Sequence, residues 1–308
     1  MTAYLTDMAN SENPARSNPA RHAIEILTRF VPRRFRTDIA IVPVVRLAGA
    51  IGVATPLRPG LLLSTIARTL ERAFETPRAC AVALAINSPG GSPAQSHLIF
   101  QRIRQLADEK HIPVLAFVED VGASGGYMLA CAADEIICDR YSIVGSIGVV
   151  GGTFGFPKLM EKLGIERRVY TAGDRKVMLD PFLPEKPDDV KRVKAIQQDM
   201  HEHFIALVKS RRGDRLHGSD KILFSGEFWT AEKAVALGLA DGLGDLRSIL
   251  RARYGDKVHT PLISAERSLF GRRLAGVNVV DALARNSGLA DDVVSAIETR
   301  ALWGRFGL

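Results

Sequence analysis

Apolar and polar residues follow two different periods along the central part of this chain. Short apolar runs bounded by turn residues predict buried strands, and longer segments with apolar residues three or four positions apart predict helices. We expect strands at residues 39–47, 80–86, 114–118 and 135–138. We expect helices at residues 62–74, 94–108, 127–133, 157–163 and 188–211. Because strands and helices alternate, the pattern favours an α/β fold with a largely parallel sheet.

A small-residue turn joins the predicted strand at 114–118 to the helix that starts near residue 127, and Ser124 lies in this turn between glycines. Glycines allow a sharp turn and a close approach of substrate, which suits a nucleophile. The helix that follows would direct free N–H groups, including that of Gly125, towards developing negative charge. A serine that only caps the helix explains the same residues, and both interpretations stay open at this point.

Gly90 and Gly91 form a second glycine turn after the predicted strand at 80–86. Their N–H groups would suit an oxyanion hole, in which donors lie about 3 Å from the charge that develops. The sequence Ser-Pro-Gly-Gly is also good turn chemistry by itself. Taken alone, this motif does not decide between an oxyanion hole and a simple turn.

The two ends of the chain differ from its centre. We expect residues 1–37 to be a flexible basic extension with a short amphipathic helix at 20–31; residues 16–36 around it contain six arginines and one acid, Glu25. Such a helix can lie on an anionic membrane or dock on a partner subunit, and we favour docking. We expect residues 249–308 to be a helical tail, with helices at 277–283 and 293–303, that covers a neighbouring subunit or folds back across a cleft.

Composition narrows the function classes. No stretch reaches the roughly 18 apolar residues of a spanning helix, and residues 1–19 lack the features of a secretory signal peptide, so we expect a protein of the cytoplasm or the cytoplasmic membrane surface. The net charge of +7 suggests an anionic partner, but 6% aromatic residues and no recognised module argue against nucleic acid. Cys80, Cys131 and Cys138 lie in apolar segments without metal-ligand spacing, which predicts reduced core thiols and no metal site.

Three motifs in order make the pattern specific: residues 86–92 (Ile-Asn-Ser-Pro-Gly-Gly-Ser), 123–127 (Ala-Ser-Gly-Gly-Tyr) and 145–149 (Gly-Ser-Ile-Gly-Val). Together they resemble the signal peptide peptidase A family of serine peptidases, the SppA and SohB group. The resemblance covers about residues 38–248. It implies a ClpP/crotonase-like fold of repeated strand-strand-helix units, with residues 38–248 as the peptidase domain.

The resemblance also implies a serine–lysine dyad. Its nucleophile would be Ser124, its general base Lys176 in the segment Gly-Asp-Arg-Lys, and Ser146 would hydrogen-bond the lysine. The family commonly has tyrosine before the lysine, whereas this chain has Arg175. A lysine base needs a pKa well below its usual value of about 10.4, which burial among the apolar residues 177–179 would supply.

On this resemblance the chain is a serine endopeptidase or oligopeptidase without a cofactor. Gly125 and either Gly90 or Gly91 would hold the oxyanion. The substrates would be extended, apolar peptides such as signal-peptide remnants, bound as an added strand beside the glycine loops. Members of this fold assemble into rings or domes, so we expect a homo-oligomer.

Three alternatives remain. The sequence Gly-Ala-Ser-Gly-Gly also fits the nucleophile elbow of an α/β-hydrolase esterase, which would need a histidine from among His201, His203, His217 and His259. We expect His201 and His203 to lie on a solvated helix face, and the esterase interpretation leaves the other two motifs unused. A crotonase-like acyl-CoA enzyme would not need Lys176. A catalytically silent scaffold, held at a membrane by residues 16–36, would bind vesicles without hydrolysis.

Overall fold

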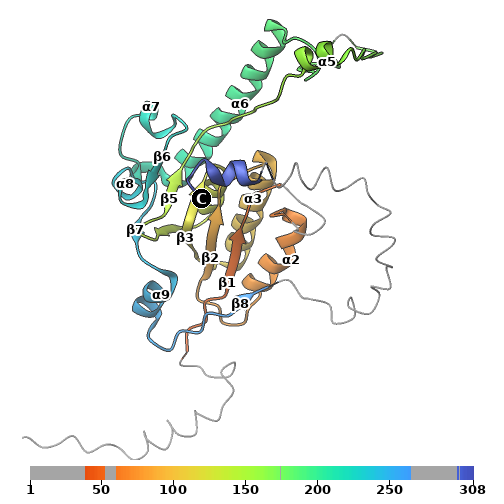
Figure 1. The fold of residues 1–308 in the computed structure, drawn as a ribbon. Helices are drawn as coiled ribbons and strands as arrows, with labels where there is room; N and C mark the ends of the chain where they lie inside the picture. Colours follow the sequence, from red (N-terminus) through yellow and green to blue (C-terminus); the bar gives the residue numbers. More distant parts are fainter. Residues whose placement is uncertain (1–38, 53–59, 174, 265–296, 298) are drawn as a thin grey trace, which may run out of the picture. The chain divides into compact units, whose positions relative to one another are not determined.

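The structure of the protein is a computed structural model that describes residues 39–52, 60–173, 175–264, 297 and 299–308. The described residues from Ala40 onwards belong to one unit (Figure 1). The helices expected at 20–31 and 277–283 lie outside the described residues.

A largely parallel sheet of eight strands organises the described residues. The strand order is β6-β5-β3-β2-β1-β8, and β4 pairs with both β3 and β7. Strands β5 and β6 pair antiparallel. The expected α/β class is therefore confirmed. The strands are β1 (Val44–Ala48), β2 (Val82–Ser88), β3 (Val114–Ala123), β4 (Glu135–Cys138), β5 (Ile143–Gly145), β6 (Phe228–Thr230), β7 (Gly242–Leu243) and β8 (Leu262–Ile263).

The described helices connect and cover these strands. They are α2 (Leu63–Phe74), α3 (Pro93–Lys110), α4 (Gly125–Ala130), α5 (Pro157–Leu163), α6 (Pro187–Arg212), α7 (Asp220–Leu223), α8 (Ala231–Ala236) and α9 (Leu246–Tyr254). Residues 299–304 are also helical. Helix α3 shows why the boundaries fall where they do: the Ser92 side chain accepts from the Gln95 N–H at its start, Pro93 follows, and the left-handed His111 ends it.

Side chains alternate between the two faces of the sheet, as strand geometry requires. On one face Val45, Leu47 and Leu84 pack in a core with residues of α2, α3 and α4 (Figure 1). On the other face Val44 and Phe117 pack in a second core with residues of α9. β8 pairs with β1, so the chain beyond residue 248, where we placed the end of the peptidase domain, adds a strand to the same sheet.

Strand β3 is five residues longer than the run at 114–118 predicts. Its pairing with β2 shifts between Ile86 and Ser88, and beyond the shift residues 121–123 pair with β5. Glu119 and Asp120 lie between the two paired parts. These charged residues interrupt the apolar pattern, which is why sequence periodicity ended the strand too early.

Residues 149–186, called the arm below, form a different kind of structure, because none of its described residues is buried. The arm has contacts of its own: the rings of Phe156 and Phe182 lie 5.6 Å apart, and Arg167 lies over Phe182 and forms an ion pair with Asp180. It includes α5 and leads into α6 (Figure 1).

Helix α6 divides into two halves. Its buried residues Phe204, Val208 and Arg212 all lie in the C-terminal half, and residues 187–203 include none. Within the described residues, no helix is long and apolar enough to cross a membrane.

Candidate active site

Ser124 lies at the junction of β3 and α4, in a backbone conformation that L-residues rarely adopt. Its φ is 53° and its ψ is −121°, and its N–H donates to the Gly145 carbonyl at 2.8 Å. Its hydroxyl makes no hydrogen bond within the part of the chain that the structure describes. A half-buried serine with a free hydroxyl on a strained strand-to-helix turn is the geometry of a nucleophile elbow.

The glycine loop after β2 lies directly against this turn. Gly90 has φ +96°, and a Cβ built on it would lie 2.8 Å from both the Gly125 nitrogen and the Ser124 Cβ. Gly91 has φ +142°, and its Cβ would lie 2.1 Å from the Ile51 carbonyl oxygen. Both positions therefore require glycine, for conformation and for space.

Two backbone N–H groups in the glycine loop after β2 and the Ser124 turn have no acceptor among the described residues. The Gly90 N–H donates to the Ser88 hydroxyl at 3.2 Å. In contrast, the N–H groups of Gly91 and Gly125 make no hydrogen bond within the described residues. The sequence did not decide whether Gly90 or Gly91 donates to the oxyanion. In the structure the Gly91 N–H has no acceptor among the described residues, whereas the Gly90 N–H is already bonded to Ser88.

Ser146 comes to the same place from the third glycine loop. It is buried at 4% exposure, has φ 52°, and its N–H donates to the Glu227 carbonyl at 2.7 Å. Ser124 and Ser146 line one cavity of about 230 Å³. The structure thus brings together the serines and glycines that the three motifs supplied.

His201 also lines this cavity, which corrects our expectation of a solvated position. Its Nε2 lies 3.0 Å from the Ile147 carbonyl oxygen. Because a carbonyl only accepts, Nε2 carries the proton and donates. His203, two positions further along α6, is exposed as expected.

Lys176 is not brought to Ser124 within this chain. Its side chain is exposed in a turn of the arm and is not among the residues that line the cavity. Its neighbour Arg175 lines a separate pocket with Asp188 and Arg192 at the start of α6. Arg192 and His201 are separated by about 14 Å along the helix, at about 1.5 Å per residue. The expected apolar surround of the lysine is therefore absent from the described residues of a single chain.

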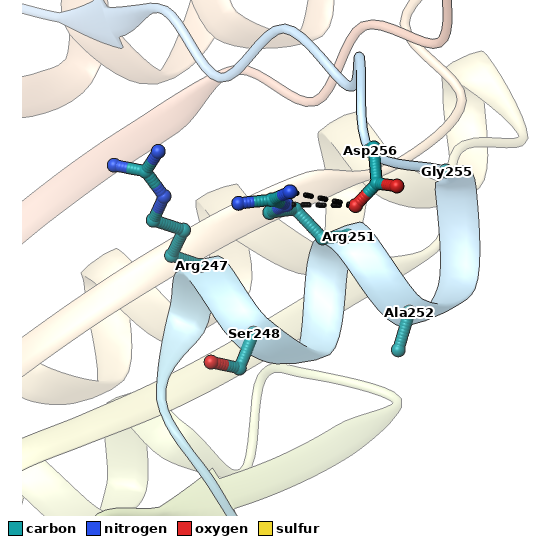
Figure 2. A pocket seen from close by; sticks show the side chains of 6 residues that line it. All are labelled: Arg247, Ser248, Arg251, Ala252, Gly255 and Asp256. Atoms are coloured by element: carbon teal, nitrogen blue, oxygen red, sulfur yellow. Dashed lines mark hydrogen bonds and ion pairs between the residues drawn. The ribbon is translucent and has the colours of Figure 1, made fainter.

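A larger cavity elsewhere holds none of the predicted site residues. It measures about 590 Å³ and lies along α9, where Arg247 and Arg251 leave the same side of the helix (Figure 2). Arg251 is paired with Asp256 at 2.7 Å. Within the described residues, no group of three or more His, Cys, Asp or Glu side chains could hold a metal ion.

The cysteines lie apart from this chemistry. All three are free, and Cys131 and Cys138 are buried. Burial raises the pKa of each of these two thiols to about 12. Both stay protonated at neutral pH, so neither is a nucleophile.

Comparison with known proteins shows similarity to one family of peptidases. Residues 107–257 match the sequence profile described as peptidase family S49. The chain is 33% identical over 236 residues to "Serine protease SPPA, chloroplastic" of Arabidopsis thaliana, covering 74% of this chain and 33% of that protein. It is 34% identical over 169 residues to "Probable protease SohB" of Buchnera aphidicola from Acyrthosiphon pisum, covering 55% and 49%. The chain therefore spans half or less of the length of each of these two relatives.

A more similar relative has a different name. The chain is 54% identical over 288 residues to a Brucella abortus protein named "Na(+)/H(+) antiporter NhaA", which covers 92% of this chain but 39% of that protein. That protein is more than twice as long as the matched region, so its name does not indicate an activity for this chain. A solved structure of a single-site mutant of a "1510-N membrane-bound stomatin-specific protease" matches with a TM-score of 0.46 and 18% identity over 74% of this chain and 99% of that one.

Proposed function

We propose that this chain, which is similar to peptidase family S49 over residues 107–257 and to a SPPA serine protease over 236 residues, is a serine peptidase whose nucleophile is Ser124. The observation that carries the proposal is the strained Ser124 turn packed against Gly90; the N–H groups of the next residues, Gly125 and Gly91, make no hydrogen bond within the described residues. This arrangement provides a nucleophile and oxyanion donors in one place.

In the proposed reaction, the Ser124 hydroxyl oxygen attacks the carbonyl carbon of a peptide bond and its proton passes to the base. The N–H groups of Gly91 and Gly125 donate to the oxyanion of the tetrahedral intermediate. The protonated base then gives its proton to the leaving amine, and an acyl-enzyme remains. Water, deprotonated by the same base, releases the acid and restores the serine.

We propose that the base is Lys176 of a second copy of the chain. In one chain the lysine is exposed and remote from the cavity, so a dyad needs another subunit. The arm that carries Lys176 also exposes a set of large apolar side chains, which is typical of an interaction surface. They include Val150, Phe154, Leu159, Leu163, Ile165 and Tyr170.

Mixing two inactive variants tests both parts of this proposal. Ser124→Ala and Lys176→Ala proteins are each expected to lack peptidase activity. After co-refolding in equal amounts, sites that combine one intact serine with one intact lysine should restore about a quarter of wild-type activity, if copies mix at random in a closed assembly. The control mixes Ser124→Ala with the double variant, which leaves every site incomplete. If the first mixture is as inactive as the control, the dyad between copies is refuted.

A histidine base is the second candidate, because His201 already lines the cavity of the same chain. Its Nε2–H is donated to Ile147, which leaves Nδ1 as the atom that could accept a proton. Activity that survives Lys176→Ala but is lost in His201→Gln would favour this base and the esterase class.

The proposed substrates are extended, rather apolar peptides that add a strand beside the glycine loops. Cleavage of such peptides in preference to small esters would support this class. Preference for small acyl esters would contradict it.

A further inference from the structure

Arg305 lines the Ser124 cavity although it lies far from the serine in sequence. Its guanidinium carbon lies 5.9 Å from the ring centroid of its neighbour Phe306. Its side chain makes no hydrogen bond and no ion pair within the residues that the structure describes. Among the described residues, this positive charge at the cavity of the proposed nucleophile therefore has an aromatic neighbour but no hydrogen-bonding or ionic partner.

Phe306 holds this segment in place. It is buried and packs with Val121 and Ala123 of β3, and its ring meets that of Phe228 edge-on at 5.1 Å. Ala123 immediately precedes Ser124, and Phe228 pairs with Gly145 in the sheet. The anchor thus holds the residue next to Arg305 against β3, which leads to Ser124, and against β6, which pairs with the strand that leads to Ser146.

The lining of the cavity carries positive charge without a compensating acid. Arg305 and His201 are its ionisable members, and no described carboxylate lines it. Glu227 is next to the lining residue Gly226, but its own side chain is not part of the lining. An unpaired guanidinium in a concave site attracts anions, and its planar donors match a carboxylate.

We infer that Arg305 is a specificity-determining residue that favours peptides with a carboxylate near the cleaved bond. The carboxylate is either the free C-terminus of the peptide or an acidic side chain. This inference rests on the proposed peptidase function and adds to it a substrate class. The site therefore combines an apolar peptide preference with one anionic contact.

Matched peptides of one sequence separate the two sources of carboxylate. One peptide ends in a free acid, a second in an amide, and further amide-capped peptides carry a glutamate in place of a glutamine at successive positions around the cleaved bond. We expect kcat/KM to be about two- to five-fold higher for a carboxylate peptide than for its neutral partner, as for a solvent-accessible ion pair. Added salt should reduce the ratio.

The variants test whether Arg305 causes this ratio. Arg305→Gln should bring the ratio close to one, Arg305→Lys should keep part of it, and Arg305→Glu should invert it. Arg300→Gln is the matched control, because Arg300 is exposed in the helical segment that ends just before Arg305 and does not line the cavity, so the ratio should not change.

Each outcome is informative. Cleavage of acid and neutral peptides at equal rates by the wild type, or a ratio that persists in Arg305→Gln, would overturn this inference and leave the peptidase proposal intact. Cleavage of no peptide by an assembled, folded sample would remove the peptidase proposal, and this inference with it.

Discussion

Ser124 and its glycine neighbours depend on one another at the scale of single residues. A non-glycine residue with positive φ costs on the order of 1–3 kcal/mol and persists only where its surroundings enforce it. Here the enforcing contacts are the bond from the Ser124 N–H to Gly145 and the close approach of Gly90. The strain at Ser124 keeps its hydroxyl at the cavity.

Gly90→Ala tests this dependence. The added methyl would lie 2.8 Å from the Ser124 Cβ, so the turn must shift, and we expect peptidase activity to fall by about 100-fold or more. The free energy of unfolding should fall by about 1–3 kcal/mol. Gly152→Ala is the control, because nothing lies within 4 Å of the methyl it would add. Equal activity in the two variants would show that the approach of Gly90 is not needed.

The glycine turns marked Ser124 and Gly91 as candidates, and the family resemblance added Ser146; the structure places the two serines on one cavity. His201 and Arg305 could not be found in this way. Each reaches the cavity through packing between segments distant in sequence, and neither lies in a motif that marks it.

At the scale of elements, α6 connects the arm to the sheet through its C-terminal half. Arg212, at 3% exposure, donates to Asp241 at 2.8 and 2.9 Å and to the Gly238 carbonyl at 2.9 Å. Burial by itself would raise the pKa of Asp241, but the hydrogen bonds from Arg212 and from the Ile136 N–H outweigh it and hold this pKa below its usual value.

The Arg212–Asp241 pair predicts a stability effect with a defined pH dependence. Asp241→Asn leaves a buried cation unpaired and should lower the free energy of unfolding by about 3 kcal/mol at pH 7. Because the folded pKa of Asp241 is lowered, the stabilisation is present above the unfolded pKa of about 3.9 and is lost as pH falls through the folded value.

Urea unfolding across pH measures this directly. The difference between wild type and Asp241→Asn should shrink as the carboxyl is protonated in acid. Asp256→Asn is the control, because the pair of Asp256 with Arg251 is exposed at 82% and 43%, and such pairs contribute little. A difference that is constant with pH would show that ionisation of Asp241 does not stabilise the fold.

Helix boundaries were the most predictable part of the fold. The patterns at 62–74, 94–108, 157–163 and 188–211 match α2, α3, α5 and α6 within two residues at each end. Strands were less predictable, because β3 passes through two charged residues and β8 is only two residues long. Such strands are defined by the strands they pair with, and the pattern of a single sequence does not show which strands pair.

At the scale of the whole molecule, the sheet region and the arm differ in how they are stabilised. The sheet carries two apolar cores on its faces, whereas the arm has no buried described residue and exposes its apolar side chains. Sequence periodicity cannot tell an apolar residue that packs within the chain from one that packs on a second copy. The position of Lys176 relative to Ser124 was therefore beyond what the sequence could supply.

Covalent labelling with a fluorophosphonate probe, located by mass spectrometry on the intact assembled protein, tests the central claim most directly. We expect a single adduct on Ser124, absent from Ser124→Ala and strongly reduced in Lys176→Ala. The buried thiols Cys131 and Cys138 should stay unmodified. An adduct on another residue that persists in Ser124→Ala, or no adduct on a folded assembly, would contradict the assignment of Ser124 as the nucleophile.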